Sequence, residues 1–421
     1  MSPVFSPGRR DLLKALAVGI TAPAAIAPAL ARGALSLFAR ELIVPPLLAG
    51  TADADGVRHY RLTMAPGVQE LVSHRETPVW GYNGDYLGPT IRVLRGQAVH
   101  IRLQNALNQS STTHWHGAHV PGDMDGGPEL LIGSGRHYDY HYTLQQPAAS
   151  LWYHPHPARR TGAHIYAGLA GLLLVDDGVG ESLGLPHTYG VDDIPLIIQD
   201  RRLFADGRLA YMTHPHDIMG MKGDHILVNG REQPHWNAPA QWVRLRILNA
   251  SNARMYNLAF ADGRTFAVVA SDAGLLSEPA LVRELLMAPA ERVEILVDLA
   301  QDRGRSVILQ SDSRRVVPAL SANPADSDAL DRSVFPLLEL RVGPRRSAPG
   351  TLPTHLATIP SLSAAGSVCR FVLRVNMKHH AMQSSPDMEM ALPRTAPRGP
   401  GGMSMGMGGM EMFSINPFLS G

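Results

Sequence analysis

Two short histidine motifs have the residue types and the spacing to bind a metal ion. The first contains His114 and His116 on either side of a tryptophan, and the second contains His154 and His156 on either side of a proline. In an extended strand, residues i and i+2 point to the same face, so each motif presents two imidazoles roughly 6.5–7 Å apart along the backbone. Two such pairs facing each other would offer four neutral nitrogen ligands, which suit copper, iron or zinc.

The composition indicates what kind of chain must position these motifs. The chain has 421 residues, a formal net charge of +1, 40 glycines, 33 prolines and one cysteine, Cys369. This length allows more than one domain, and the balanced charge argues against nucleic acid as a partner. Abundant glycine and proline favour many short strands joined by turns. A single cysteine excludes an intrachain disulfide.

Alternating and buried apolar segments predict two β domains, at residues 41–178 and 190–343. The histidine motifs lie in the first domain. Candidate strands recur every ten or so residues with no long helical period, which predicts an all-β sandwich or barrel. These candidate strands are residues 57–64, 91–94, 98–103, 138–144, 168–175, 194–200, 226–228, 242–249 and 292–298.

The two β regions resemble each other weakly. In the first, an Asn83-Gly84 turn leads to an alternating strand that ends at Asn105; in the second, Asn229-Gly230 leads to one that ends at Asn249. Such an internal echo is typical of domain duplication. The second copy has residues 249–252 where the first copy continues into its histidine motif, so we expect it to be a structural copy without metal ligands.

Residues 1–31 are predicted to be a twin-arginine export signal. Arg9 and Arg10 precede an apolar, alanine-rich run and a small-residue cleavage site. A membrane anchor or an ordinary helix is the alternative, but the run is short and contains Pro23 and Pro28. We therefore expect a periplasmic protein that uses the twin-arginine machinery and keeps no stable membrane anchor after cleavage.

Residues 344–421 are predicted to form a linker, a methionine-rich segment and the start of an incomplete third domain. Thioether ligands select Cu(I), so the methionines are candidates for capturing Cu(I), although a disordered tail is the alternative. The candidates are Met377, Met382, Met388, Met390, Met403, Met405, Met407, Met410 and Met412.

The motifs together resemble a known family, the three-domain bacterial multicopper oxidases, and in particular the periplasmic copper-efflux (cuprous) oxidases. The order and spacing of the matching segments agree as well as the residue types. These segments are residues 80–84, 87–89, 114–117, 120–122, 125–128, 154–156, 161–162 and 168–171.

The resemblance implies tandem cupredoxin-like Greek-key domains and a trinuclear copper cluster between the first and third domains. His114 resembles a ligand of the type 2 copper, and His116, His154 and His156 resemble type 3 ligands. Asp125 matches an acidic residue that relays protons to the cluster, a role that a nearby carboxylate can perform.

The chain also departs from the family pattern. No His-Cys-His motif occurs, and Cys369 has no flanking histidine. A blue copper site needs a cysteine thiolate. We therefore expect two complete cupredoxin domains plus a fragment of a third, in a truncated or frameshifted member that lacks the type 1 copper and half of the trinuclear ligands and is inactive by itself.

The leading functional hypothesis is a copper-tolerance oxidase that oxidises Cu(I), or phenols, and reduces dioxygen to water. One alternative is a non-catalytic periplasmic copper-binding protein. Another is a copper-free structural relative of the kind associated with cell division, against which the retained histidine pairs argue. Of the other histidines, His164 is expected to pack or support the site, and His214 and His216 to be solvated.

Overall fold

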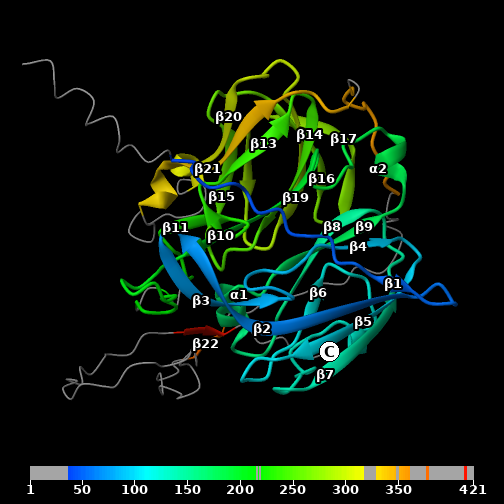
Figure 1. The fold of residues 1–421 in the computed structure, drawn as a ribbon, viewed down its shortest axis with the longest axis vertical. Helices are drawn as coiled ribbons and strands as arrows, with labels where there is room; N and C mark the ends of the chain where they lie inside the picture. Colours follow the sequence, from blue (N-terminus) through cyan, green and yellow to red (C-terminus); the bar gives the residue numbers. More distant parts are fainter. Residues whose placement is uncertain are drawn as a thin grey trace, which may run out of the picture.

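A computed structural model of the chain describes residues 37–214, 217, 220–316, 329–347, 350–360, 376–378 and 412–414. These residues form mainly strands with a few short helices, which confirms the predicted all-β class with tandem domains. Two β-sandwiches lie one above the other in Figure 1, the first in blue to cyan-green and the second in green to yellow. The predicted export signal at residues 1–31 lies outside the described residues.

The first sandwich is made of a five-stranded and a four-stranded sheet. The larger sheet has the order β1-β2-β5-β7 with β3 paired to β2, and the smaller has the order β4-β9-β8-β6. The strands are β1 (Thr51–Ala52), β2 (Arg58–Val72), β3 (Arg75–Tyr82), β4 (Ile91–Leu94), β5 (Ala98–Asn105), β6 (His114–His116), β7 (His137–Thr143), β8 (Ala149–His154) and β9 (Gly171–Asp176). Strand β2 is much longer than its alternating stretch predicts, because it continues into a hairpin with β3.

The second sandwich packs a seven-stranded sheet against a five-stranded one. The sheet orders are β12-β11-β10-β14-β19-β16-β17 and β13-β21-β20-β15-β18. The strands are β10 (Asp193–Arg201), β11 (His225–Val228), β12 (Arg231–Glu232), β13 (His235–Pro239), β14 (Trp242–Asn249), β15 (Tyr256–Phe260), β16 (Phe266–Ser271), β17 (Gly274–Val282), β18 (Glu284–Met287), β19 (Arg292–Asp298), β20 (Ser306–Asp312) and β21 (Val334–Gly343).

The internal echo in the sequence corresponds to equivalent hydrogen bonds in the two sandwiches. Asn83 and Asn229 both adopt positive φ, at 54° and 50°. The Asn83 side chain accepts the N–H of Thr63 in β2, and the Asn229 side chain accepts the N–H of Ile197 in β10. In both sandwiches that strand then pairs in parallel with a later one, β2 with β5 and β10 with β14.

Strand β8 joins the two sandwiches. All of its residues are buried. Its inner side chains Leu151 and Tyr153 enter the core of the first sandwich, while Trp152 packs with Ile197 and Leu248 of the second. Burial on both faces agrees with the mainly apolar sequence of this strand, in which Ser150 is the polar exception before the histidine.

A buried network of charges fixes the same contact. Ser150 of β8 donates to Glu294 of β19 at 2.6 Å, and Glu294 also accepts from Arg246 of β14 at 2.9 Å. Arg246 in turn donates from Nε and Nη2 to the two carboxylate oxygens of Asp193 in β10. Because each buried charge has an opposite partner, the network holds β8 at a defined position against the second sandwich.

The remaining elements are short. Helices α1 (Thr161–Ala167) and α2 (Val179–Ser182) and the 3-10 turns η2 (Gly122–Met124), η4 (Ser313–Arg315) and η6 (Leu330–Arg332) connect strands. Among the described residues, no helix is both long enough and apolar enough to cross a lipid bilayer. Strands β22 (Asn376–Lys378) and β23 (Met412–Ser414) pair antiparallel and contain Met377 and Met412. The other seven candidate methionines lie outside the described residues.

Candidate metal centre

Strands β6 and β8 bring the two histidine motifs together. They pair antiparallel at the edge of the four-stranded sheet, and His114 lies directly opposite His154 in the register. Trp115, between the first two histidines, points the other way into the core and is fully buried. The alternation of the strand therefore places His114 and His116 on one face, as the spacing predicted.

Three of the four imidazoles converge on one small volume. His114, His116 and His154 each offer a nitrogen, and these atoms all lie within 4.8 Å of one another. His116 Nδ1 and His154 Nε2 are 3.2 Å apart. Two nitrogens bound to one metal ion at about 2.0 Å in a tetrahedral arrangement would be about 3.3 Å apart. The spacing thus fits two ligands of a shared ion.

Backbone carbonyls orient two of these rings. His114 Nδ1 lies 2.9 Å from the carbonyl oxygen of Asp125, and His154 Nδ1 lies 2.8 Å from that of Pro155. A carbonyl only accepts, so both Nδ1 atoms carry the proton, and each Nε2 presents a lone pair. A hydrogen bond from the second ring nitrogen is the usual way in which a protein orients a metal-binding histidine.

Burial favours the neutral form of two of these imidazoles, those of His116 and His154. Desolvation, together with the positive charge of Arg292, lowers the pKa of His116 to about 4. Burial also holds the pKa of His154 well below its ordinary value. Neutral imidazole is the form that binds copper, zinc, iron and nickel, so these residues fit the copper that the family resemblance implies.

His156 lies just past the end of β8, at the edge of the cluster. Its ring centroid is 5.4 Å from that of His114 and 6.0 Å from that of His154. Its backbone N–H donates to the Thr112 hydroxyl at 2.7 Å. Its Nδ1 is buried without a hydrogen-bond partner among the described residues, so the ring has a free nitrogen available.

A tight loop places Asp125 beside the cluster. One carboxylate oxygen of Asp125 lies 3.2 Å from His114 Nδ1, and the side chain is 36% exposed. The next residue, Gly126, has φ +74°, and a Cβ there would come within 1.7 Å of the Thr113 carbonyl oxygen. Only glycine permits this approach. Asp125 therefore joins His114 to solvent, which suits a residue that passes protons.

Some residues around the cluster carry no sequence signal. Arg292, at the start of β19 in the second sandwich, donates to the Ser150 carbonyl and pairs with Asp272 at 2.8 Å. It reaches Gly117, where a Cβ would lie 2.9 Å from its Nη2. The Trp152 ring packs against that of His154 at a tilt of 32°, with ring centroids 4.0 Å apart. Arg292 is 136 residues beyond the second motif and 176 beyond the first, so only the folded chain reveals that it lies beside the histidines.

The other histidines are placed apart from the three-nitrogen group. His164 in α1 is 2% exposed, with Nδ1 2.9 Å from Ser111 Oγ and its ring 5.0 Å from that of Trp80. Burial lowers the pKa of His164 to about 4, so this ring is neutral. His214 is exposed, and His216 lies outside the described residues.

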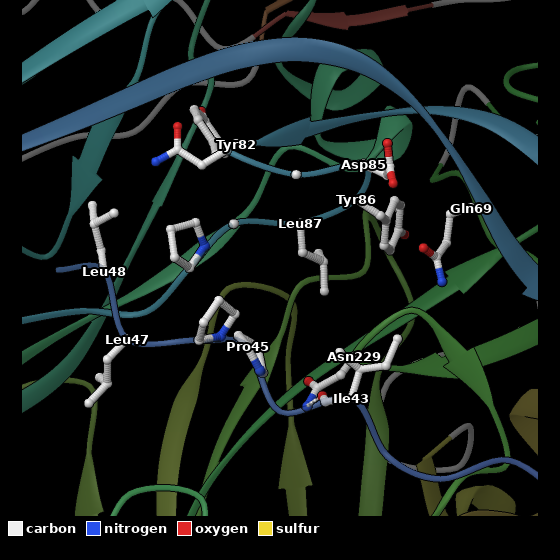
Figure 2. Close-up of a pocket in the computed structure, with 15 residues that line it drawn as sticks. Ile43, Pro45, Leu47, Leu48, Gln69, Tyr82, Asp85, Tyr86, Leu87 and Asn229 are labelled. Atoms are coloured by element: carbon white, nitrogen blue, oxygen red, sulfur yellow. Dashed lines mark hydrogen bonds between the residues drawn. The ribbon is translucent and has the colours of Figure 1, made fainter.

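A cavity of about 360 Å³ lies elsewhere, between the two sandwiches. In Figure 2 the segment with Ile43, Pro45 and Leu48 runs along one side of it and the loop with Tyr82 and Leu87 along the other. None of the four motif histidines lines it. The cavity is therefore separate from the candidate metal centre.

Comparisons with known proteins show which family the chain resembles. Two family models described as multicopper oxidase match residues 65–179 and 204–331. The chain is 37% identical to multicopper oxidase mco of Staphylococcus haemolyticus over 288 residues, which are 68% of this chain and 64% of that protein. It is also 37% identical to the cell division protein FtsP of Dickeya dadantii over 346 residues, covering 81% of this chain and 70% of that one.

A solved structure of a multicopper oxidase also resembles the chain. The laccase-like multicopper oxidase CueO from Ochrobactrum sp. superposes with a TM-score of 0.68 at 35% identity, covering 78% of this chain and 69% of that one. This chain thus spans less than two thirds of the length of the staphylococcal relative and slightly more of the other two. The matching models, the identity and the shared cupredoxin-like fold lead to one conclusion: the chain belongs to the multicopper oxidase family.

Proposed function

We propose that the chain is part of an oxidase of the copper-tolerance type, in which copper at the β6–β8 histidines, together with the further ligands that the family resemblance implies, would couple oxidation of Cu(I) to reduction of dioxygen to water. The observation that carries the proposal is the convergence of three imidazole nitrogens within 4.8 Å, at a position held by both sandwiches. Bound copper would supply the electron transfer to dioxygen. The family resemblance implies further ligands, and the sequence contains no His-Cys-His motif to supply them.

The protein residues would orient ligands and move protons. His114 and His154 keep Nε2 free because each donates Nδ1–H to a backbone carbonyl. His116 stays neutral through its low pKa and so needs no deprotonation before it binds metal. Dioxygen reduction consumes protons, and Asp125 lies between His114 and solvent as their proposed route.

Copper binding by the three-nitrogen group is tested by counting copper per chain after dialysis. His116→Ala with His154→Ala should lose the copper held at this site, whereas His214→Ala, an exposed histidine, should not. Equal copper content in all three proteins would remove the proposal. Oxygen uptake with Cu(I), with phenols as alternative substrates, then tests turnover.

We also propose that the methionine segment captures Cu(I) for this reaction. The support is chemical, because thioethers are soft ligands that select Cu(I), and nine methionines lie between residues 377 and 412. Deleting residues 377–412 should weaken Cu(I) binding and leave Cu(II) binding at the histidines unchanged. Unaltered Cu(I) affinity in the deletion would exclude this role.

A second candidate function is a non-catalytic one. The similarity to the cell division protein FtsP extends over 81% of this chain, more than the similarity to the staphylococcal oxidase. Copper content and dioxygen consumption together distinguish the oxidase from the non-catalytic alternatives. A chain that purifies with copper at the histidines but consumes no dioxygen would be a copper-binding protein, and one that binds no copper would be a structural relative.

We further propose that the protein is periplasmic and is exported by the twin-arginine route. The support is the pair Arg9 and Arg10 ahead of an apolar run. Changing both arginines to lysine should retain the full-length protein in the cytoplasmic fraction. Continued appearance of the variant in the periplasm would refute the route.

A further inference from the structure

Three histidines form a row across the outer face of the five-stranded sheet, away from the candidate metal centre. His59 in β2 is the register partner of His100 in β5, and His100 is the register partner of His141 in β7. Their strand neighbours Tyr60 and Ile101 are buried in the core, so the histidines face outward. The His100 and His141 rings stack with centroids 4.2 Å apart.

Two of these imidazoles each have a carboxylate on the outer ring nitrogen. His59 Nε2 lies 2.7 Å from Asp53 Oδ2, and His100 Nε2 lies 2.8 Å from Asp139 Oδ1. An ionised carboxylate only accepts hydrogen bonds, so both Nε2 atoms must donate. In the neutral rings, both Nδ1 atoms are then lone-pair acceptors.

The two carboxylates are held in place by other groups. The second oxygen of Asp53 accepts the backbone N–H groups of Asp55 and Val57. Arg102 bonds both oxygens of Asp139, at 2.8 and 3.0 Å. Each of the two imidazoles is thus oriented by a carboxylate that is itself held by further hydrogen bonds.

The inner nitrogens of the pair meet each other. His59 Nδ1 and His100 Nδ1 are 2.9 Å apart. Two lone pairs at this distance repel unless a cation lies between or beside them. Asp139 is paired with Arg102, but Asp53 has no arginine or lysine partner among the described residues, so its charge favours a cation at His59. The side chains of His59 and His100 are 38% and 20% exposed, so an ion can enter from solvent.

We propose that His59 and His100 form a second metal site, which binds one divalent late transition metal ion through the two Nδ1 atoms, with water as the remaining ligands. Carboxylate–histidine pairs of this kind are the usual support of metal-binding imidazoles. Cu(II) should bind most tightly, because affinity for nitrogen ligands peaks at copper among the first-row divalent ions. The rings need only pivot about their carboxylate contacts to admit the ion.

The first test counts metal. The full chain and its variants are dialysed against CuCl₂ and the copper per chain is measured. His59→Ala with His100→Ala should hold one equivalent less than the parent, and His355→Ala, an exposed histidine elsewhere, should match the parent. A His114→Ala, His116→Ala, His154→Ala protein should keep this equivalent. Unchanged copper in the His59/His100 variant would overturn the proposal.

The second test uses a change that leaves both imidazoles in place. Asp53→Asn keeps an oxygen to accept the two backbone N–H groups but loses the charge behind His59. Measured by Cu(II) titration in the triple-alanine protein, its affinity should fall about 10–100-fold. Asp55→Asn, in the same exposed turn, is the control and should bind as before. If Asp53→Asn and Asp55→Asn bind Cu(II) with equal affinity, the bound copper does not depend on the Asp53–His59 contact, and the proposed site is wrong. The short distance between the two Nδ1 atoms would then reflect a shared proton.

Discussion

Gly126 offers a sharp test of how the loop after β6 supports the metal centre. A Cβ at this position would lie 1.7 Å from the Thr113 carbonyl oxygen, and real Cβ atoms essentially never come closer than 3.0 Å. Gly126→Ala must therefore move the loop from β6 by at least 1.3 Å, the difference of these two distances. The 2.9 Å contact of His114 Nδ1 with the Asp125 carbonyl would then exceed hydrogen-bond range.

The expected result is a specific loss of copper affinity. Without the Asp125 carbonyl, the His114 ring is free to rotate and to change tautomer, and removal of such a supporting contact typically weakens metal binding about 10–100-fold. Alanine at positive φ also costs about 1–2 kcal/mol of folding stability. Copper titration measures the first effect, and denaturant unfolding of the copper-free protein measures the second.

Gly135→Ala separates the two effects. Gly135 has almost the same backbone angle, φ +71° against +74°, but an added Cβ would meet nothing within 4 Å. It should lose the same conformational stability and keep the parent affinity for copper. If Gly126→Ala binds copper as tightly as Gly135→Ala, the contact between Asp125 and His114 does not support the site.

Two further predictions concern buried charges and buried imidazoles. Glu294→Gln leaves Arg244 without its buried counter-charge and Arg246 with Asp193 alone, and should cost about 3–5 kcal/mol in denaturant unfolding, so a loss below about 1 kcal/mol would contradict it. Burial raises the pKa of Glu294, but the two arginines outweigh this and set it at about 2, so its contribution is complete above pH 4.5 and is lost as the pH falls towards 2. Burial lowers the pKa of His164 from 6.5 to about 4, so copper-free protein should lose about 3 kcal/mol as the pH falls through this window. His164→Leu should remove that part of the acid sensitivity, and an identical pH profile would show that His164 does not cause it.

The sequence by itself determined the fold class, the tandem arrangement and the central motif. Alternation along 98–103 and 242–249 predicted strands. The first has one buried face, whereas the second is buried on both faces because Arg244 and Arg246 pair with buried carboxylates. The Asn-Gly signals predicted turns, since Asn83 and Asn229 must adopt positive φ. These are local constraints, which short stretches of sequence carry by themselves.

Helix α1 was not predicted, because seven residues give too short a period to distinguish it from a loop. The sharing of one metal site by the two histidine pairs was expected, but the register of His114 opposite His154 and the 3.2 Å approach of His116 to His154 depend on how β6 and β8 pair.

Only the tertiary structure decided which distant residues complete each site. Arg292 reaches the first histidine motif from the second sandwich, and the row of His59, His100 and His141 comes from three strands spread over 80 residues. Contacts between residues far apart in the chain arise from sheet register and from the packing of the two sandwiches through β8. No local pattern encodes them, because register is set by the burial of whole strands and not by the residues that happen to meet.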